Sequence, residues 1–185
     1  VVFTLPASVS GTSLDFRWPF TYQMNASVQR QVTRDVSVSA AYVGSLGRSL
    51  PFTQDLNYPI FGPGATSANV DQRRPILPNQ LGSIAMVKSI MNTSYHGLQI
   101  TGEKRMSRSI SFKGYYTYSK SLEGARLQND TTAGGAEDMN NLSLEKGRTD
   151  NDRRHNFVMS MVWQIYYVSQ GNPVLRHLAN GWTVS

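Results

Sequence analysis

All-β is the fold class that the sequence predicts, from its composition, its period-two alternation and the unequal lengths of its connections. Only 16% of the 185 residues are charged, against roughly 25% in a typical soluble domain. This composition does not favour a helical bundle. Cysteine is absent, which excludes a disulfide framework, a cysteine-ligated zinc site and a thiol nucleophile.

The alternation is clearest over residues 18–31. Their even positions to residue 28 are apolar, and the odd positions from residue 21 are polar: Trp18, Phe20, Tyr22, Met24, Ala26 and Val28 against Thr21, Gln23, Asn25, Ser27, Gln29 and Gln31. Successive side chains of a β-strand point to opposite faces, so this segment predicts a strand with one apolar and one polar face.

The same pattern recurs along the chain and predicts an antiparallel up-and-down meander. We expect further strands near 36–45, 94–105, 110–120 and 154–165, with the start of another at 181–185. Two of the turns are short, at 32–35 and 106–109, whereas the loops expected at 46–92 and 122–152 are long. Compact soluble domains rarely contain two such loops, but transmembrane β-barrels combine short periplasmic turns with long extracellular loops.

Strand direction agrees with a transmembrane barrel, because both short turns fall on one side and both long loops on the other. Residues 83–92 would break this parity as a separate crossing, so we expect them to extend the strand that begins near Ser94. The connection at 167–180 is longer than usual for a periplasmic turn. About five or six strands cannot close a barrel, since the smallest bacterial barrels have about eight. The chain is therefore expected to be one sector of a larger barrel.

The two faces predict two sets of functional positions. The lumen-facing candidates are Gln23, Asn25, Ser27, Gln29, Ser37, Ser39, Gln99, Thr101, Glu103, Lys113, Thr117, Ser160 and Gln164. The lipid-facing candidates are Phe20, Tyr22, Met24, Val28, Val38, Leu98, Ile100, Phe112, Tyr116, Phe157, Met159, Met161 and Trp163. Aromatic residues gather towards strand ends, which is typical of the rings at a membrane interface. The alternative is a soluble or surface-exposed β-sandwich, an adhesin or a carbohydrate-binding module, in which the apolar side chains are buried between two sheets.

Four stretches carry a family resemblance: residues 22–31 with 41–45, residues 94–100 with 103–105, residues 111–121 and residues 145–158. Their order and spacing resemble the barrel of TonB-dependent outer-membrane transporters, especially the Oar-like group with a carboxypeptidase-regulatory-like N-terminal domain. Residues 1–185 would then be an internal part of that barrel. The family's plug domain and energy-coupling residues have no counterparts in this sequence.

The resemblance implies a 22-stranded barrel in the bacterial outer membrane that takes up a ligand, here of unknown identity. The implied partners are outer-membrane lipid, the rest of the barrel with its plug domain, an inner-membrane energy-coupling complex and an extracellular ligand. Nucleic acid is not expected as a partner, because the 18 Lys and Arg residues are scattered and the net charge is only +6.

No constellation indicates an enzyme, a cofactor site or a metal site. Asp150, Asp152 and His155 lie close in sequence, but adjacent arginines oppose cation binding, and strand alternation would separate Asp150 and Asp152 from His155. We expect polar residues in salt bridges at the outer mouth of a strand. His96 and His177 are isolated in the sequence. Neither a nucleophile elbow nor a phosphate-binding loop occurs.

Overall fold

The computed structural model describes residues 4–124, 136–166 and 172–185. The long strands are β2 (Phe20–Gln31), β3 (Val36–Asp55), β4 (Leu81–Ser107), β5 (Ile110–Glu123) and β7 (His155–Ile165). Shorter strands are β1 (Ala7–Thr12), β6 (Gly147–Arg148) and β8 (Trp182–Val184). All eight belong to one sheet, so the predicted all-β meander is confirmed.

The order of neighbours in the sheet is β2-β3-β4-β5-β7-β8, which follows the chain. Each strand of this path therefore pairs with its neighbours in sequence, as in an up-and-down barrel. The sheet is not closed: β2 and β8 stand at its two ends. The β-sandwich alternative needs a second sheet, whereas the described residues form only this one.

The chain divides into two compact units, which we describe separately. The loop unit comprises the described parts of residues 1–22, 45–94 and 121–150. The turn unit comprises the described parts of residues 23–44, 95–120 and 151–185. Both short turns belong to the turn unit, and both long connections belong to the loop unit.

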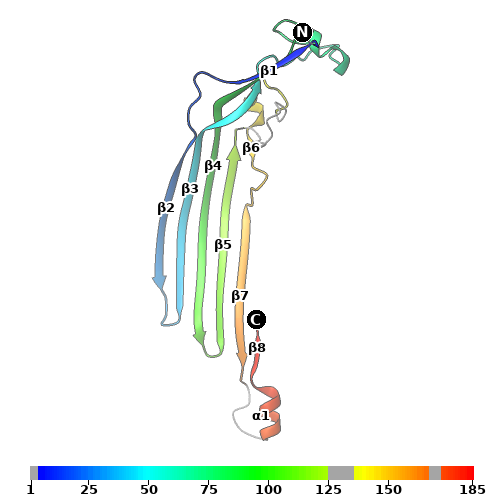
Figure 1. Ribbon diagram of the computed structural model, residues 1–185. Coiled ribbons are helices and arrows are strands. Elements are labelled where there is room, and N and C mark those ends of the chain that lie inside the picture. Colours follow the sequence, from blue (N-terminus) through cyan, green and yellow to red (C-terminus); the bar gives the residue numbers. More distant parts are fainter. Residues whose placement is uncertain (1–3, 125–135, 167–171) are drawn as a thin grey trace. The chain divides into compact units, whose positions relative to one another are not determined.

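In the turn unit, β2, β3, β4, β5 and β7 run side by side, and the β2–β3 and β4–β5 turns lie at the same end (Figure 1). The first turn is closed by Val32, whose N–H donates to the carbonyl of Val36 at 2.8 Å. Arg108 and Ser109 form the second turn with φ values of 50° and 67°. The connection after β7 contains α1 (Pro173–Ala179), a helix that the alternation did not predict.

β3 and β4, whose outer parts belong to the loop unit, both extend beyond their predicted ends. β3 continues to Asp55 and β4 begins at Leu81, so the expected loop at 46–92 shrinks to residues 56–80. Residues 83–92 are part of β4, as expected from strand direction. In the β4 extension polar and apolar side chains mix on both faces, which hides the strand from alternation. In the β3 extension Arg48 and Pro51 interrupt the alternation of Leu46, Leu50 and Phe52 with polar residues.

Further elements of the loop unit were not predicted from the sequence. β1 pairs with β4 in parallel, from Ala7 opposite Leu81 to Thr12 opposite Val87. A Cβ at Gly82 would lie 2.6 Å from the Ser8 hydroxyl oxygen, so the Ser8 side chain would have to move. Within the expected loop at 122–152, β6 pairs with the end of β5, and residues Leu142–Glu145 form a 3-10 helix.

Buried apolar side chains are few, and those described all belong to the loop unit. Phe52, Met91 and Met139 form this small core, with Leu50 and Leu142 packed against it. In the turn unit, the described apolar residues are exposed or half-buried. The turn unit therefore has no apolar core of its own among the described residues. Its apolar surface is available for contact with lipid or with a protein partner.

Candidate functional site

The register between β5 and β7 gathers the predicted lipid-facing residues on one face. Phe112 lies opposite Met161, and Tyr116 lies opposite Phe157. Directly paired residues of an antiparallel sheet share a face, so these side chains form one apolar surface. Met159 lies opposite Gly114 and is 55% exposed.

The other predicted lipid-facing residues are also exposed or half-buried. In the turn unit, the exposed ones on β2, β3 and β4 are Met24, Val28, Val38, Leu98 and Ile100, and Trp163 of β7 is half-buried. Phe20 and Tyr22 belong to the loop unit, where their rings meet edge to face with centroids 5.3 Å apart. Contact with lipid stays a prediction for each residue.

The opposite face of the turn unit carries the lumen-facing candidates. Lys113 lies opposite Ser160, and Thr117 lies opposite Asn156. The Lys113 ammonium group pairs with the Glu103 carboxylate at 3.5 Å, which joins two of these candidates across β4 and β5. The face is not wholly polar, because Tyr115 lies opposite Val158.

The remaining lumen-facing candidates lie within strands of the turn unit. They are Gln23, Asn25, Ser27 and Gln29 on β2, Ser37 and Ser39 on β3, Gln99 and Thr101 on β4, and Gln164 on β7. The Gln164 N–H donates to the Ser109 carbonyl at 2.8 Å, so this end of β7 is fixed against the β4–β5 turn. Contact with a plug domain or a solute is untested and stays a prediction.

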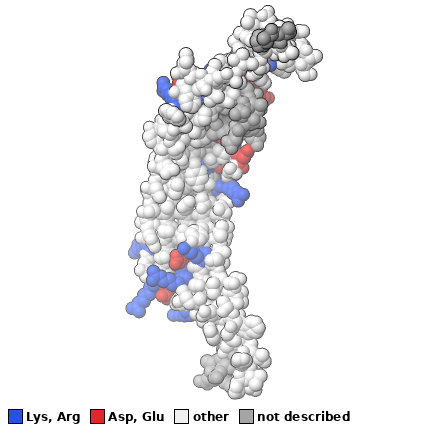
Figure 2. All heavy atoms as spheres, in the orientation of Figure 1, with Lys and Arg blue, Asp and Glu red and all other residues white. Residues whose placement is uncertain are grey.

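A region without charged residues runs across all five strands of the turn unit. It comprises residues 23–29, 36–44, 95–102, 114–119 and 155–165. Figure 2 shows the uncharged surface on the face in view, with Lys and Arg gathered beyond it at the short-turn end of these strands. Charged side chains are costly at the centre of a bilayer, so this distribution suits a membrane-spanning sheet.

Two tyrosine–histidine pairs lie on the apolar face. The Tyr42 hydroxyl is 2.6 Å from His96 Nδ1, and the Tyr116 hydroxyl is 2.8 Å from His155 Nδ1. His96 is isolated in the sequence because its partner, Tyr42, is 54 residues away. Each pair combines an apolar ring with a polar tip, which is typical of side chains at a membrane interface.

Asp150 and Asp152 lie outside the strand that the alternation argument assumed for them and His155. β7 begins only at His155, so strand alternation does not assign faces to the two aspartates. Asp150 belongs to the loop unit and the other two to the turn unit. The described residues contain no cluster of three or more His, Cys, Asp or Glu that could hold a metal ion.

The connection at residues 56–80 is anchored in the loop unit by buried polar groups. Asn57 is fully buried, and its side-chain amide donates to the carbonyls of Ile76, Leu81 and Gly82 at 2.8–3.2 Å. Its side-chain oxygen accepts the Ile76 N–H at 2.7 Å. These bonds tie the two ends of the connection together.

Asp55 completes this anchor at the end of β3. Its carboxylate accepts the N–H groups of Asn57 and Ile84, each at 2.9 Å, and pairs with the Arg74 guanidinium at 3.3 Å. Arg74 also pairs with Asp71 at 3.0 Å. Hydrogen bonds to a buried ion pair satisfy its charges, so the connection is held in one conformation.

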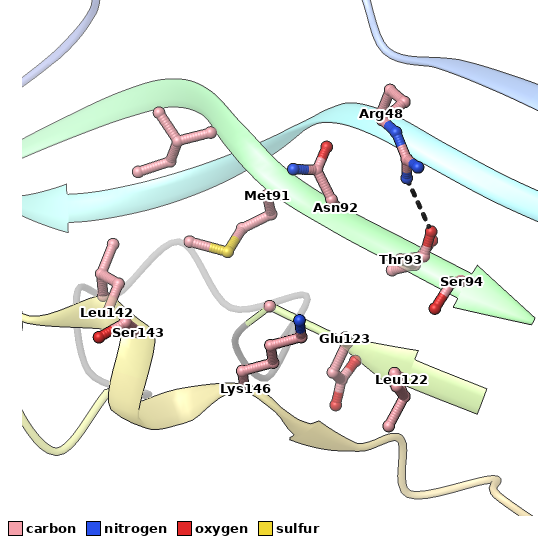
Figure 3. Close-up of a pocket in the computed structure, with 12 residues that line it drawn as sticks. Arg48, Met91, Asn92, Thr93, Ser94, Leu122, Glu123, Leu142, Ser143 and Lys146 are labelled. Carbon is pink, nitrogen blue, oxygen red and sulfur yellow. Dashed lines mark hydrogen bonds between the residues drawn. The ribbon is translucent and has the colours of Figure 1, made fainter. Parts of the chain in front are cut away.

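A cavity of about 520 Å³ lies in the loop unit. Its lining combines Arg48 of β3, residues 90–94 of β4, residues 122–124 at the end of β5, and Leu142, Ser143 and Lys146 (Figure 3). Arg48 donates to the Thr93 carbonyl at 3.3 Å. The lining mixes apolar side chains with polar groups and charges of both signs, and a small solute would fit its volume.

A second cavity of about 630 Å³ lies between the two long connections of the loop unit. Tyr58, Ile60 and Phe61 contribute apolar surface from one connection, and Glu137 and Asp138 contribute acidic groups from the other. The alternation that located the strands gave no signal for either cavity.

Another polar group of the loop unit lies in the segment between β1 and β2. The Ser13 hydroxyl donates to the Asp15 carboxylate, and this hydrogen bond is the main cause that lowers the pKa of Asp15. Ser89 holds the same segment, since its hydroxyl donates to the Arg17 carbonyl at 2.7 Å. These bonds fix the approach to β2.

The whole chain, residues 1–185, matches the family described as outer membrane beta barrel domain. Comparisons with curated proteins and with solved structures found no match. The described residues include no helix long and apolar enough to cross a membrane. The family match agrees with the open meander and its exposed apolar face. The chain therefore belongs to the outer membrane beta barrel domain family, and it is part of a protein of the bacterial outer membrane.

Proposed function

We propose that the chain is a sector of a TonB-dependent receptor barrel that takes up an extracellular ligand. Support comes from the resemblance to the Oar-like group and from membership of an outer-membrane barrel family. The observation that carries the proposal is the organisation of the long connections in the loop unit, which are anchored by buried bonds and line two cavities.

Anchored loops favour a receptor over a passive pore. A pore needs only a water-filled lumen, whereas a receptor needs a surface whose groups are fixed before the ligand arrives. Asp55, Asn57 and Arg74 provide such fixation for residues 56–80. The proposed role is binding and passage, without a catalytic step, cofactor or metal.

The open edges of the sheet support a larger assembly. β2 and β8 stand at the ends of the path, and an unpaired strand edge is not tolerated in hydrocarbon. The proposed partners are therefore the rest of the barrel and a plug domain within it. The inner-membrane energy-coupling complex and an extracellular ligand complete the proposal, with no nucleic acid.

Crosslinking of the full-length protein to the energy-coupling complex tests this function. Cells that produce the full-length protein would be treated with a membrane-permeable crosslinker, and TonB would be sought in the purified product. A matched strain without the energy-coupling complex serves as the control. In the strain with the energy-coupling complex we expect a specific TonB adduct. In the control strain we expect receptor-dependent solute accumulation to be lost. Solute passage that is equal in both strains, with no adduct, would favour a passive barrel instead.

A further inference from the structure

Three exposed arginines lie at the short-turn end of the turn unit. Arg30 is on β2, Arg34 is in the β2–β3 turn, and Arg108 is in the β4–β5 turn. Figure 2 shows Lys and Arg gathered at this end, beyond the surface without charge. Six cationic residues are found here, against the two acids Asp35 and Glu103: Arg30, Arg34, Lys104, Arg105, Arg108 and Lys113.

The three arginines differ from the neighbouring lysines because their charged groups have no described partner, whereas those of the lysines do. Lys104 donates to the carbonyls of Ser107 and Ile110, each at 2.7 Å, and Lys113 pairs with Glu103. Among the residues that the structure describes, the guanidinium groups of Arg30, Arg34 and Arg108 have no ion pair and no hydrogen-bond partner. They are therefore available to an anion from outside the chain.

The apolar surface leads directly to Arg30, and the turns with Arg34 and Arg108 follow at the same end (Figure 1). Arg30 follows Val28 on the same face of β2 by strand alternation, and Val28 is 69% exposed. Arg105 lies on the opposite face, because it shares a face with Glu103, whose carboxylate pairs with Lys113. The surface therefore combines exposed hydrocarbon with an arginine border, which fits the boundary between acyl chains and headgroups.

We propose that Arg30, Arg34 and Arg108 bind the phosphate groups of anionic phospholipids where the sheet leaves the hydrocarbon. The planar guanidinium group matches phosphate with two parallel hydrogen bonds. Lipid is favoured over a soluble polyanion because the adjacent apolar side chains are exposed, as Met106 at 45% shows. The proposal rests on the outer-membrane location and is independent of TonB-dependent uptake.

The test measures which lipid occupies this border. The full-length protein, with a fluorophore at a Met106→Cys substitution, would be placed in phosphatidylcholine vesicles. Phosphatidylglycerol or phosphatidylcholine carrying a nitroxide on the headgroup would then be added as the quencher. At low salt we expect phosphatidylglycerol to be at least fivefold preferred at this position. Equal quenching by both lipids would overturn the proposal.

Matched substitutions distinguish specific contact from net charge. Arg30→Gln should lower the preference by about twofold, whereas Arg105→Gln, of equal charge but on the opposite face, should leave it nearly unchanged. Arg30→Gln combined with Arg34→Gln and Arg108→Gln should abolish it. Equal effects of the two single substitutions would contradict the assignment. Circular dichroism checks the folding of each variant, and the single substitutions decide the result if the triple variant does not fold.

Inorganic phosphate distinguishes the lipid surface from a site for the free anion. Sodium phosphate and sodium chloride at matched ionic strength should reduce the preference equally, through screening alone. A much stronger effect of inorganic phosphate would mean that the arginines hold free phosphate, and it would overturn the lipid assignment.

Discussion

Asn57 is the residue whose side chain does most to fix the long connection of the loop unit. It is fully buried and, from one end of residues 56–80, makes four side-chain hydrogen bonds to backbone groups at the other end. The sequence could not indicate this role, since asparagine is common in exposed turns and its partners are 19–25 residues away. The same holds for Asp55, whose ion pair with Arg74 also depends on the fold.

Asn57→Ala should destabilise the loop unit by about 2–3 kcal/mol, because it leaves buried backbone groups without partners. Hydrogen exchange of residues 56–80 in the full-length protein measures the effect. Gln80→Ala is the control, because Gln80 is exposed and a surface change there should cost less than about 0.5 kcal/mol. Unchanged protection of residues 56–80 in the Asn57 variant would show that the anchor is dispensable.

Tyr42 illustrates a residue of which only part could be predicted. Alternation placed it on the apolar face, but its hydrogen bond to His96 depends on the cross-strand register. Tyr42→Phe should lower the free energy of unfolding in lipid by about 1 kcal/mol, because it removes that bond but keeps the ring. Tyr22→Phe is the matched control, since no partner of the Tyr22 hydroxyl is described. Equal losses in both variants would argue against the pair.

At the scale of elements, alternation located the five long strands where one face is apolar. It failed in the extensions of β3 and β4 within the loop unit, and it missed β1, which adds to β4 in parallel. In the β4 extension polar and apolar side chains mix on both faces, so that segment shows no period of two. β1 alternates, but it is only six residues long, and Arg48 and Pro51 interrupt the pattern in the β3 extension. Backbone pairing, rather than side-chain pattern, defines them.

β7 offers the sharpest test of the two faces. Met159→Lys should cost about 2–4 kcal/mol in a bilayer, because it places a charge on the proposed lipid face near the midplane. Ser160→Lys, one residue on, should cost much less because that position is expected to face the lumen. Unfolding in lipid vesicles of the full-length protein measures both. A smaller cost at Met159 than at Ser160 would reverse the assignment of faces.

At the scale of the whole molecule, the open sheet predicts dependence on a membrane environment. The turn unit has exposed apolar side chains on β2–β5 and β7, and β2 and β8 each leave an edge for a further strand. The 185-residue chain alone should therefore aggregate in plain buffer and show a β-rich circular dichroism spectrum only in detergent or lipid. A cooperative, soluble β-fold in buffer would contradict this.

The barrel class could be predicted from the sequence because lipid imposes a regular pattern on every crossing strand. The loop unit could not, because water imposes no such pattern and its contacts join distant segments. Asp55 and Arg74, for example, are far apart in sequence and meet only after the connection at 56–80 has folded. Ligand selection is proposed for this less predictable part, in the two cavities.

The central claim is that alternate residues of the turn unit face lipid, and accessibility along β7 tests it most directly. Residues 1–185 contain no cysteine. After replacement of any cysteine elsewhere in the full-length protein, nitroxide labels can be attached in bilayers at single cysteines introduced over residues 156–163. We predict oxygen accessibility at 157, 159, 161 and 163, and accessibility to a water-soluble nickel reagent at 156, 158, 160 and 162. Accessibility that does not alternate, or that alternates in the opposite phase, would contradict the account.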